Sequence, residues 1–202
     1  MTTPIAVLLS GRGSNFLALQ GAVAAGRLPA RIVRVVSDVD GAPGLLKARA
    51  LGVAAVAIPR AAEPSRADHE RKLLAELASA GAEWVCLAGY MRLLSPAFVS
   101  RFPRRLINIH PSLLPSFPGL HAQRQALAAG VKISGCTVHF VDEGLDSGPI
   151  VAQRAVEVLD GDAEAALAAR ILEQEHELYP AALRRLITES WRIEGRRVVF
   201  AP

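Results

Sequence analysis

The alternation of short β-branched runs with stretches rich in Ala and Leu, over the first half of the chain, constrains its fold more than any other feature. Each run has the length of a strand, and each intervening stretch has the length and composition of a helix. Strands are therefore expected at residues 5–10, 31–37, 54–58, 84–88 and 106–109, and helices at 15–25, 42–51, 65–80 and 96–101. Successive strands joined through a helix pair in parallel with a right-handed crossover. The first half therefore predicts an open α/β fold with a mostly parallel sheet.

The pattern changes after residue 110, where Gly, Pro and Ser interrupt the sequence. The expected elements are a helix at 123–129, an antiparallel pair at 134–141 and 149–158, an amphipathic helix at 163–187 interrupted before Pro180, and a hairpin at 191–200. No repeat, linker or low-complexity tract separates the two parts. The sequence therefore predicts a single domain, residues 1–202, with an N-terminal part of about 1–100 and a C-terminal part of about 101–202.

The chain is basic, with a formal net charge of +4 and a pI of about 9.6. Its basic residues are scattered, and the longest basic runs are pairs such as Arg104-Arg105. A nucleic-acid-binding surface usually gathers Lys and Arg on one face or along one helix. The charge therefore favours anionic small molecules, such as phosphates and carboxylates, over nucleic acid.

The hydrophobic content is typical of a globular chain, because hydrophobic residues make up 51% and charged residues 21%. No apolar run approaches the ~20 residues that a membrane helix needs, and the first residues lack the basic stretch of a signal peptide. Cys86 and Cys136 lie in apolar runs, which predicts buried, free thiols in a reducing compartment. We therefore expect a cytoplasmic protein that does not associate with a membrane.

A glycine-containing turn, Ser-Gly-Arg-Gly-Ser-Asn at residues 10–15, lies between the first predicted strand and the first predicted helix. Such a turn points backbone N–H groups and the positive end of a helix dipole at one place, which favours a phosphate. The segment lacks the third glycine of a dinucleotide fingerprint, because residue 16 is Phe, and it lacks the Lys of a P-loop. An ordinary glycine turn with a helix cap remains the alternative.

Asn108 and His110 stand two residues apart on a predicted strand, so their side chains face the same side. They lie at the carboxyl end of that strand, where ligands bind in open α/β sheets. An amide donor beside an imidazole can stabilise an oxyanion and move a proton. The loop bracketed by Pro111 and Pro115 restricts the backbone that follows. A turn cap beside a core histidine is the other interpretation of this pair.

An acidic loop at residues 142–149 lies between two predicted strands and carries three carboxylates and two glycines. One carboxylate near His110 would hold the imidazole in its cationic form or orient it. Taken alone, the loop could equally be a solvated surface turn.

Several segments of the chain, in their order and spacing, resemble the phosphoribosylglycinamide formyltransferases, small folate-dependent members of the formyl-folate transferase superfamily. These segments are residues 11–15, 88–95, 108–115 and 145–149, together with Gln174-Glu175-His176 before Tyr179-Pro180. The His-Pro-Ser-Leu-Leu-Pro segment is shared by the superfamily, whereas the turn at 11–15 and the Gln-Glu-His segment select this family. The resemblance covers essentially all 202 residues. It implies a Rossmann-like fold, with helices on both faces of the sheet and two ligands in one cleft.

The resemblance implies formyl transfer from 10-formyltetrahydrofolate to the amine of 5-phosphoribosylglycinamide, a step of purine (IMP) biosynthesis. The catalytic residues it implies are Asn108 and a protonated His110, which hold the oxyanion, and Asp146, which favours the imidazolium. The residues implied for the ribonucleotide are Gly13, Ser14 and Asn15 at its phosphate and Glu175 at its glycinamide. The residues implied for the folate are Arg66 at its tail, Met91, Arg92, Leu93, Leu94, Asn108, Asp142, Glu143, Gly144, Leu145 and Asp146. His121 and His139 are expected to have structural or supporting roles.

Two other functions remain open. A formyltetrahydrofolate hydrolase, or a formyltransferase that acts on methionyl-tRNA or a nucleotide sugar, shares the Asn-x-His and Asp pattern, but the known forms carry extra domains. A non-catalytic phosphate-binding module would need only the turn at residues 11–15. The five histidines form no metal-binding motif, so no metal is expected. We expect small molecules as the only ligands, and a monomer or a homodimer.

Overall fold

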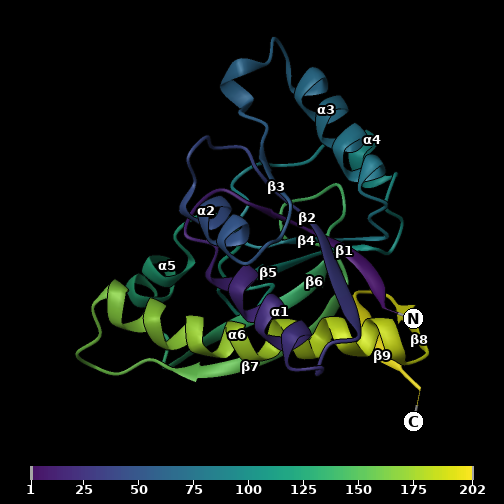
Figure 1. Cartoon of the computed structure of the whole chain (residues 1–202). Helices are drawn as coiled ribbons and strands as arrows, with labels where there is room; N and C mark the ends of the chain where they lie inside the picture. Colours follow the sequence, from purple (N-terminus) through teal and green to yellow (C-terminus); the bar gives the residue numbers. More distant parts are fainter. Residues whose placement is uncertain (1, 202) are drawn as a thin grey trace. The chain divides into compact units, whose positions relative to one another are not determined.

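The computed structural model describes residues 2–201, and these divide into two compact units, Met1–Ile107 and Asn108–Pro202 (Figure 1). The first unit is an α/β unit with parallel strands, and the second has antiparallel strands and a long helix. The predicted fold class, α/β with a mostly parallel sheet and an antiparallel C-terminal portion, is confirmed. Within residues 2–201, no helix is both long enough and apolar enough to span a membrane.

In the first unit, four parallel strands lie in the order β3-β2-β1-β4. The strands are β1 (Thr3–Leu9), β2 (Ala30–Ser37), β3 (Ala55–Ala57) and β4 (Trp84–Leu87), and the helices are α1 (Ser14–Ala24), α2 (Pro43–Ala50), the 3-10 turn η1 (Arg60–Ala62), α3 (Arg66–Ser79) and α4 (Pro96–Val99). The side chains of β1 from Ile5 to Leu9 are fully buried, as expected for a parallel strand covered on both faces. The predicted strand at 54–58 is only three residues long, because β3 pairs with a single neighbour through Ala55–Ala57.

The second unit begins within β5 (Leu106–His110), whose last three residues belong to it. The remaining elements are α5 (Ala122–Ala128), β6 (Ile133–Phe140), β7 (Ile150–Glu157), α6 (Glu164–Thr188), β8 (Trp191–Glu194) and β9 (Arg197–Phe200). Strands β6 and β7 form the predicted antiparallel pair, β8 and β9 form the predicted hairpin, and α6 packs on β6 and β7 (Figure 1). Cys86 in the first unit and Cys136 in the second are buried thiols that form no disulfide within the described residues, as predicted.

The expected interruption of the long helix before Pro180 is wrong, because α6 continues through Pro180 for 25 residues. A proline inside a helix removes one backbone hydrogen bond and costs about 3 kcal/mol. Here the side chains on both sides of the proline, including Leu178, Tyr179 and Leu183, are buried. Their burial contributes about 1.5–3 kcal/mol for each large apolar side chain, which is enough to offset the cost of the proline.

The turn that opens α1 depends on a close approach between two glycines. Gly13 caps α1 in the left-handed conformation, with φ of 70°, and a Cβ atom there would lie 2.7 Å from the Cα atom of Gly44 at the start of α2. The N–H of Gly44 donates to the carbonyl of Gly11 at 3.0 Å, and the Lys47 ammonium donates to the carbonyl of Arg12 at 2.8 Å. These contacts fix the turn at 11–13 on the first turns of α2.

We expect Gly13→Ala to lower the free energy of unfolding by about 1–3 kcal/mol, the usual cost of a strained backbone, because alanine combines a left-handed φ with a backbone clash. Urea denaturation measures the change. Gly21→Ala is the matched control, because Gly21 lies inside α1 with no atom near a Cβ, and alanine there should stabilise by about 0.5–1 kcal/mol. Equal stability of Gly13→Ala and the wild type would contradict this account of the turn.

Candidate active site

His110 lies at the end of β5 with hydrogen-bond acceptors facing both of its ring nitrogens. Its Nε2 atom is 2.9 Å from the carbonyl oxygen of Phe117. A carbonyl oxygen can only accept, so Nε2 carries a hydrogen and donates this hydrogen bond. Its Nδ1 atom is 3.4 Å from Oδ2 of Asp146. The side chain is buried, so water competes little for either contact. The doubly protonated imidazolium satisfies both acceptors, and this is the form that can give a proton to a substrate.

The Phe117 carbonyl is held in place by hydroxyl groups in the loop that follows β5. Ser112 Oγ donates to the carbonyl of Ser116 at 2.6 Å. Thr137 Oγ1 on β6 donates to the carbonyl of Ser112 at 2.7 Å and accepts from the N–H of Leu114 at 3.0 Å. The contact with His110 could not be predicted from residue type, because Phe117 contributes a backbone atom that any residue could supply.

Asp146 joins the site from the loop after β6, in the left-handed conformation with φ of 49°. Its Oδ2 atom accepts from the backbone N–H of Gly119 at 2.8 Å as well as facing His110. Its Oδ1 atom lies 3.7 Å from Nε2 of His139. The structure therefore brings together Asn108, His110 and Asp146, with the Asp146 carboxylate between two imidazoles.

His139 on β6 orients the Asn108 carboxamide. Burial lowers the pKa of His139, and the nearby charge of His110 lowers it further, whereas the Phe140 carbonyl and the charges of Asp146 and Asp142 act in the opposite direction. Its Nδ1 atom donates to the Phe140 carbonyl at 2.8 Å, so in the neutral ring Nε2 is an acceptor for Asn108 Nδ2 at 3.2 Å. An amide nitrogen carries two hydrogens, so this bond leaves a second donor on Asn108.

We expect the free energy of unfolding to fall as the pH drops below 6.5, the ordinary pKa of histidine. Below this pH the unfolded chain binds a proton at His139, while in the folded protein the lowered pKa keeps the ring neutral. One such group contributes up to about 1.4 kcal/mol per pH unit, until the pH reaches the lowered pKa of the folded state.

Urea titrations of the wild type and His139→Gln near neutral and mildly acidic pH measure this effect. The variant should lose less stability on acidification than the wild type. Burial also lowers the pKa of His176, but that residue is present in both proteins, so the comparison isolates His139. Equal losses in the two proteins would show that His139 does not carry the effect.

The loop at residues 142–148 folds back on itself. Asp142 Oδ1 accepts from Ser147 Oγ at 2.7 Å and from the N–H of Gly144 at 3.2 Å. A Cβ atom on Gly148 would lie 1.9 Å from the carbonyl oxygen of Phe140, so only glycine fits where the loop returns to β6. Glu143 and Leu145 are exposed on the loop. The carboxylate of Asp142 is therefore used to shape the loop.

The residues predicted to bind a phosphate, Gly13, Ser14 and Asn15, form the start of α1 in the first unit. The first N–H groups of a helix have no partner within the helix, and the helix dipole favours an anion there. Ser14 is half-buried and Asn15 is buried. The chemistry of this helix start therefore suits a phosphate.

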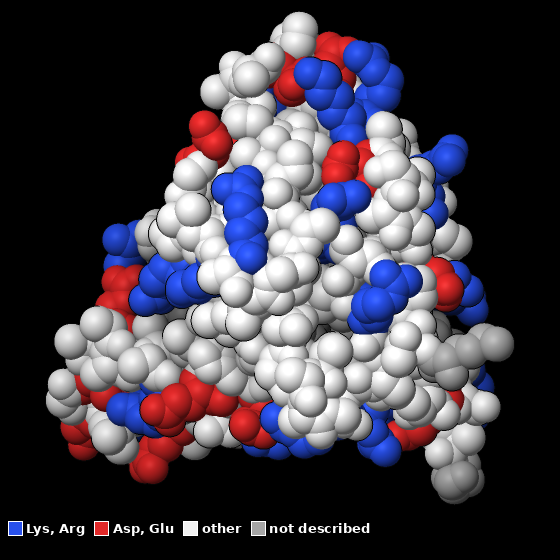
Figure 2. Space-filling view, in the orientation of Figure 1, with Lys and Arg blue, Asp and Glu red and all other residues white. Residues whose placement is uncertain are grey.

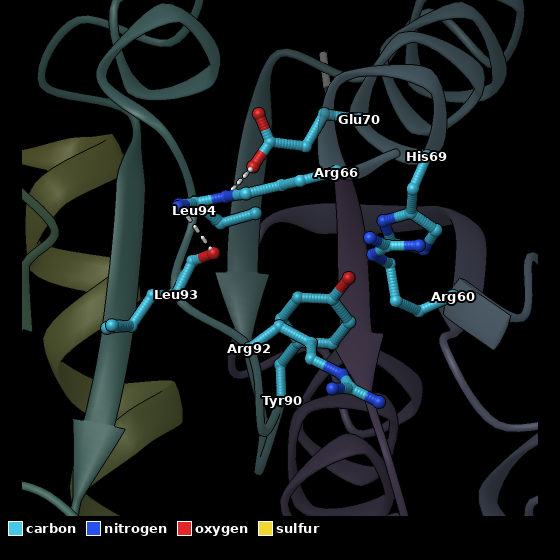
Figure 3. Close-up of a pocket in the computed structure, with 8 residues that line it drawn as sticks. All are labelled: Arg60, Arg66, His69, Glu70, Tyr90, Arg92, Leu93 and Leu94. Carbon is cyan, nitrogen blue, oxygen red and sulfur yellow. Dashed lines mark hydrogen bonds and ion pairs between the residues drawn. The ribbon is translucent and has the colours of Figure 1, made fainter. Parts of the chain in front are cut away.

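Four of the residues predicted to bind the folate in the first unit, Arg66, Arg92, Leu93 and Leu94, line a pocket of about 220 Å³, whereas Met91 does not (Figure 3). The pocket is lined by Arg60, Arg66, His69, Glu70, Tyr90, Arg92, Leu93 and Leu94. Figure 3 shows Arg66 extended between Glu70 and the carbonyl of Leu93, with distances of 3.0 and 2.8 Å. The pocket holds three guanidinium groups, of which Arg66 is paired with Glu70 and Arg92 with Asp38. His69 is tied to the Ile58 carbonyl through Nε2 at 2.9 Å.

A family model described as formyl transferase matches residues 3–183. The chain belongs to the formyl transferase family. This membership confirms the resemblance that the motifs predicted.

Relatives of this formyl transferase include both single and multifunctional proteins. It is 43% identical, over 95% of this chain and 88% of the relative, to the phosphoribosylglycinamide formyltransferase of Escherichia coli. It is 48% identical to the trifunctional purine biosynthetic protein adenosine-3 of Drosophila pseudoobscura, of which it spans 14% of the length. A crystal structure of glycinamide ribonucleotide transformylase 1 from Symbiobacterium toebii superposes with a TM-score of 0.97, at 49% identity over 100% of this chain and 95% of that one.

The remaining predicted site residues of this formyl transferase are distant in sequence from Asn108, His110 and Asp146, or lie on other elements. Glu175 is buried on α6. The pKa of the Cys136 thiol on β6 is raised to about 12, mainly by burial of the thiol and further by the negative charge of Glu175. Met91 and Leu93 are exposed, whereas Leu94 is buried. His121 is exposed at the start of α5. Within residues 2–201, no three His, Cys, Asp or Glu side chains are grouped as a metal site requires.

Proposed function

We propose that this protein transfers the formyl group of 10-formyltetrahydrofolate to the amine of 5-phosphoribosylglycinamide, giving formylglycinamide ribonucleotide and tetrahydrofolate in purine biosynthesis. The relative in Escherichia coli that carries this activity in its name supports the proposal, because it aligns over most of both chains. The observation that carries the proposal furthest is the placement of His110 between a carbonyl and a carboxylate, with an oriented carboxamide nearby.

In the proposed reaction the amine attacks the formyl carbon, a C–N bond forms, and the carbonyl oxygen becomes an oxyanion. The second hydrogen of Asn108 Nδ2 and the Nδ1 proton of His110 donate to this oxygen. Nδ1 is suited to this step because its contact with Asp146, at 3.4 Å, is longer than the Nε2 bond to Phe117, at 2.9 Å. When the intermediate collapses, the C–N10 bond breaks, N10 leaves with a proton, and the attacking nitrogen loses one.

We propose that two binding regions hold the substrates for this step. The phosphate of the ribonucleotide is bound at the start of α1 by Gly13, Ser14 and Asn15, and its glycinamide by Glu175. The pteridine ring is bound by the backbone of residues 91–94 and by the loop at 142–146. Arg66, at a pocket with three guanidinium groups, suits the carboxylates of the folate tail. Holding two substrates in contact removes much of the entropic cost of a bimolecular reaction. No metal is assigned a role, because side chains supply both the oxyanion donors and the proton transfer.

The anionic ligands agree with the surface charge. On the face drawn in Figure 2, Lys and Arg side chains are separated by uncharged and acidic residues. A scattered positive charge of this kind attracts small anions without forming a continuous track for nucleic acid.

The absorbance change of the folate, followed with and without 5-phosphoribosylglycinamide, tests the proposal. We expect 10-formyltetrahydrofolate to be consumed only when the ribonucleotide is present. Consumption with release of formate in the absence of the ribonucleotide would instead identify a hydrolase. Binding of the ribonucleotide without any consumption of the folate would identify a phosphate-binding module.

A further inference from the structure

The segment from Gly89 to Ser95, which connects β4 to α4, has no regular secondary structure. Tyr90 and Leu94 are buried, but Met91 and Leu93 expose 59% and 64% of their surface, so burial of side chains alone does not hold the middle of the segment. A segment of this kind would ordinarily sample several backbone conformations. Its shape must therefore come from contacts with neighbouring elements.

The first of these contacts is with Asp38, which directly follows β2 and whose side chain is only 1% exposed. Oδ2 of Asp38 accepts from Nε of Arg92 at 2.7 Å. Oδ1 accepts from the hydroxyl of Ser10, and the Ser10 oxygen accepts in turn from the N–H of Met91 at 2.8 Å. An ionised carboxylate only accepts, so it fixes the direction of the Ser10 hydroxyl and leaves the oxygen free for the Met91 N–H. Asp38 thus holds the start of the segment through one side chain and one backbone amide.

The second contact is with Glu70 on α3, whose side chain is 8% exposed. Oε1 of Glu70 accepts from the N–H of Ser95 at 2.9 Å and from Nε of Arg66 at 3.0 Å, and Oε2 accepts from the Ser95 hydroxyl. Arg66 in turn donates to the Leu93 carbonyl at 2.8 Å, as Figure 3 shows. Glu70 therefore holds the end of the segment both directly and through Arg66.

Tyr90 lies close enough to both anchors for their charges to act on its phenol. Burial raises the pKa of Tyr90, and the charges of Asp38 and Glu70 raise it further, while that of Arg92 lowers it. The neutral phenol thus lies within the field of both carboxylates. Both anchors are charged hydrogen bonds in buried surroundings, where removal of one partner leaves the others unsatisfied at a cost larger than that of a surface contact.

We propose that Asp38 and Glu70 are positioning residues for the folate, which hold the backbone of residues 91–94 from its two ends in the conformation that binds the pteridine ring. The inference rests on the proposed function for its ligand, whereas the two anchors are independent of it. Ser10 and Ser95 act with them. The Ser10 hydroxyl accepts from the Met91 N–H, and the Ser95 N–H donates to Glu70, so each serine connects a carboxylate to the backbone of the segment. Neither carboxylate contacts the reacting atoms in this proposal, so each acts on binding of the folate and leaves the chemical step intact.

Amide hydrogen exchange of the free protein tests the anchors without any substrate. We expect Asp38→Ala to speed exchange of the Met91 N–H at least tenfold and Glu70→Ala to do the same for the Ser95 N–H. Asp40→Ala is the matched control, because Asp40 is an exposed carboxylate two residues from Asp38 that bonds only the neighbouring Gly41 N–H. Exchange at Met91 that is the same in Asp38→Ala and in the control would overturn the proposal.

Steady-state kinetics test the link to the folate. We expect Asp38→Ala and Glu70→Ala to raise the KM for 10-formyltetrahydrofolate about tenfold, with kcat and the KM for the ribonucleotide changed less than about twofold. Asp38→Asn should recover part of the loss, because its oxygen can still accept from Ser10 but its charge no longer pairs with Arg92. If Asp38→Ala does not fold, Ser10→Ala removes the bonds to Met91 and to Oδ1 of Asp38 but keeps the Asp38–Arg92 pair, and it should raise the same KM. A tenfold fall of kcat with an unchanged KM for the folate would overturn the proposal. A wild-type protein that transfers no formyl group would refute the proposed function, but it would leave the hydrogen-exchange result unaffected.

Discussion

Replacement of His110 by alanine is expected to lower kcat for formyl transfer by at least about 10²- to 10³-fold, the usual loss when one oxyanion donor is removed. The His110 imidazole faces both the Phe117 carbonyl and the Asp146 carboxylate. An alanine at this position leaves no group that can donate to the oxyanion from the same place. Both substrates should still bind, because their proposed contacts lie on other residues. Single-turnover rates measure the chemical step, and calorimetric titration with each ligand measures binding.

His121→Ala is the matched control for this experiment, since His121 is an exposed histidine eleven residues further along the chain. It should keep the rate of the wild type. Loss of the Nε2 bond leaves the Phe117 carbonyl with only the longer bond from Ser112 Oγ at 3.2 Å, so thermal unfolding of the His110 variant should be measured beside the kinetics. A folded His110→Ala variant with a rate near that of the wild type would refute the assignment of His110 as the proton donor.

The order of elements and the pairing of Asn108 with His110 could be predicted from sequence because both depend on local periodicity. Alternation of strand and helix patterns determined the parallel strands of the first unit, and the two-residue repeat of a strand put the Asn108 and His110 side chains on one side. The continuity of α6 through Pro180 could not be predicted, because it depends on burial of residues such as Tyr179 against other elements. Local propensity favours a break there, and tertiary packing overrides it.

The supporting contacts of the site could not be predicted from sequence for a different reason. The Phe117 carbonyl is a backbone atom, so residue type carries no information about it. The role of His139 depends on its protonation state, which is set by burial. Asp38 contacts Arg92, 54 positions away, and nothing in the local sequence around Asp38 marks it. Each of these contacts therefore became visible only when distant segments were placed together in three dimensions.

Asp146→Asn is expected to lower kcat by about 10²-fold or more, with a smaller effect on the KM for the folate, because it removes the negative charge that faces His110 but keeps the shape of a side chain in the loop proposed to bind the pteridine ring. If the new carboxamide oxygen keeps the Gly119 N–H bond, its nitrogen takes the position 3.7 Å from His139 Nε2. There it competes with Asn108 for the same acceptor, so a single substitution disturbs both proposed oxyanion donors.

Thermal unfolding of this variant separates a charge effect from a structural one. If the carboxylate acts through its charge, kcat should fall while the unfolding transition stays cooperative and close to that of the wild type. A misfolded variant would lose the cooperative transition together with kcat. Asp160→Asn is the control for loss of one negative charge, since the Asp160 side chain is 88% exposed and pairs only with Lys132 at the surface. Wild-type kcat in Asp146→Asn would contradict the role of this carboxylate, and a loss of kcat together with loss of the cooperative unfolding transition would show that the residue acts on structure alone.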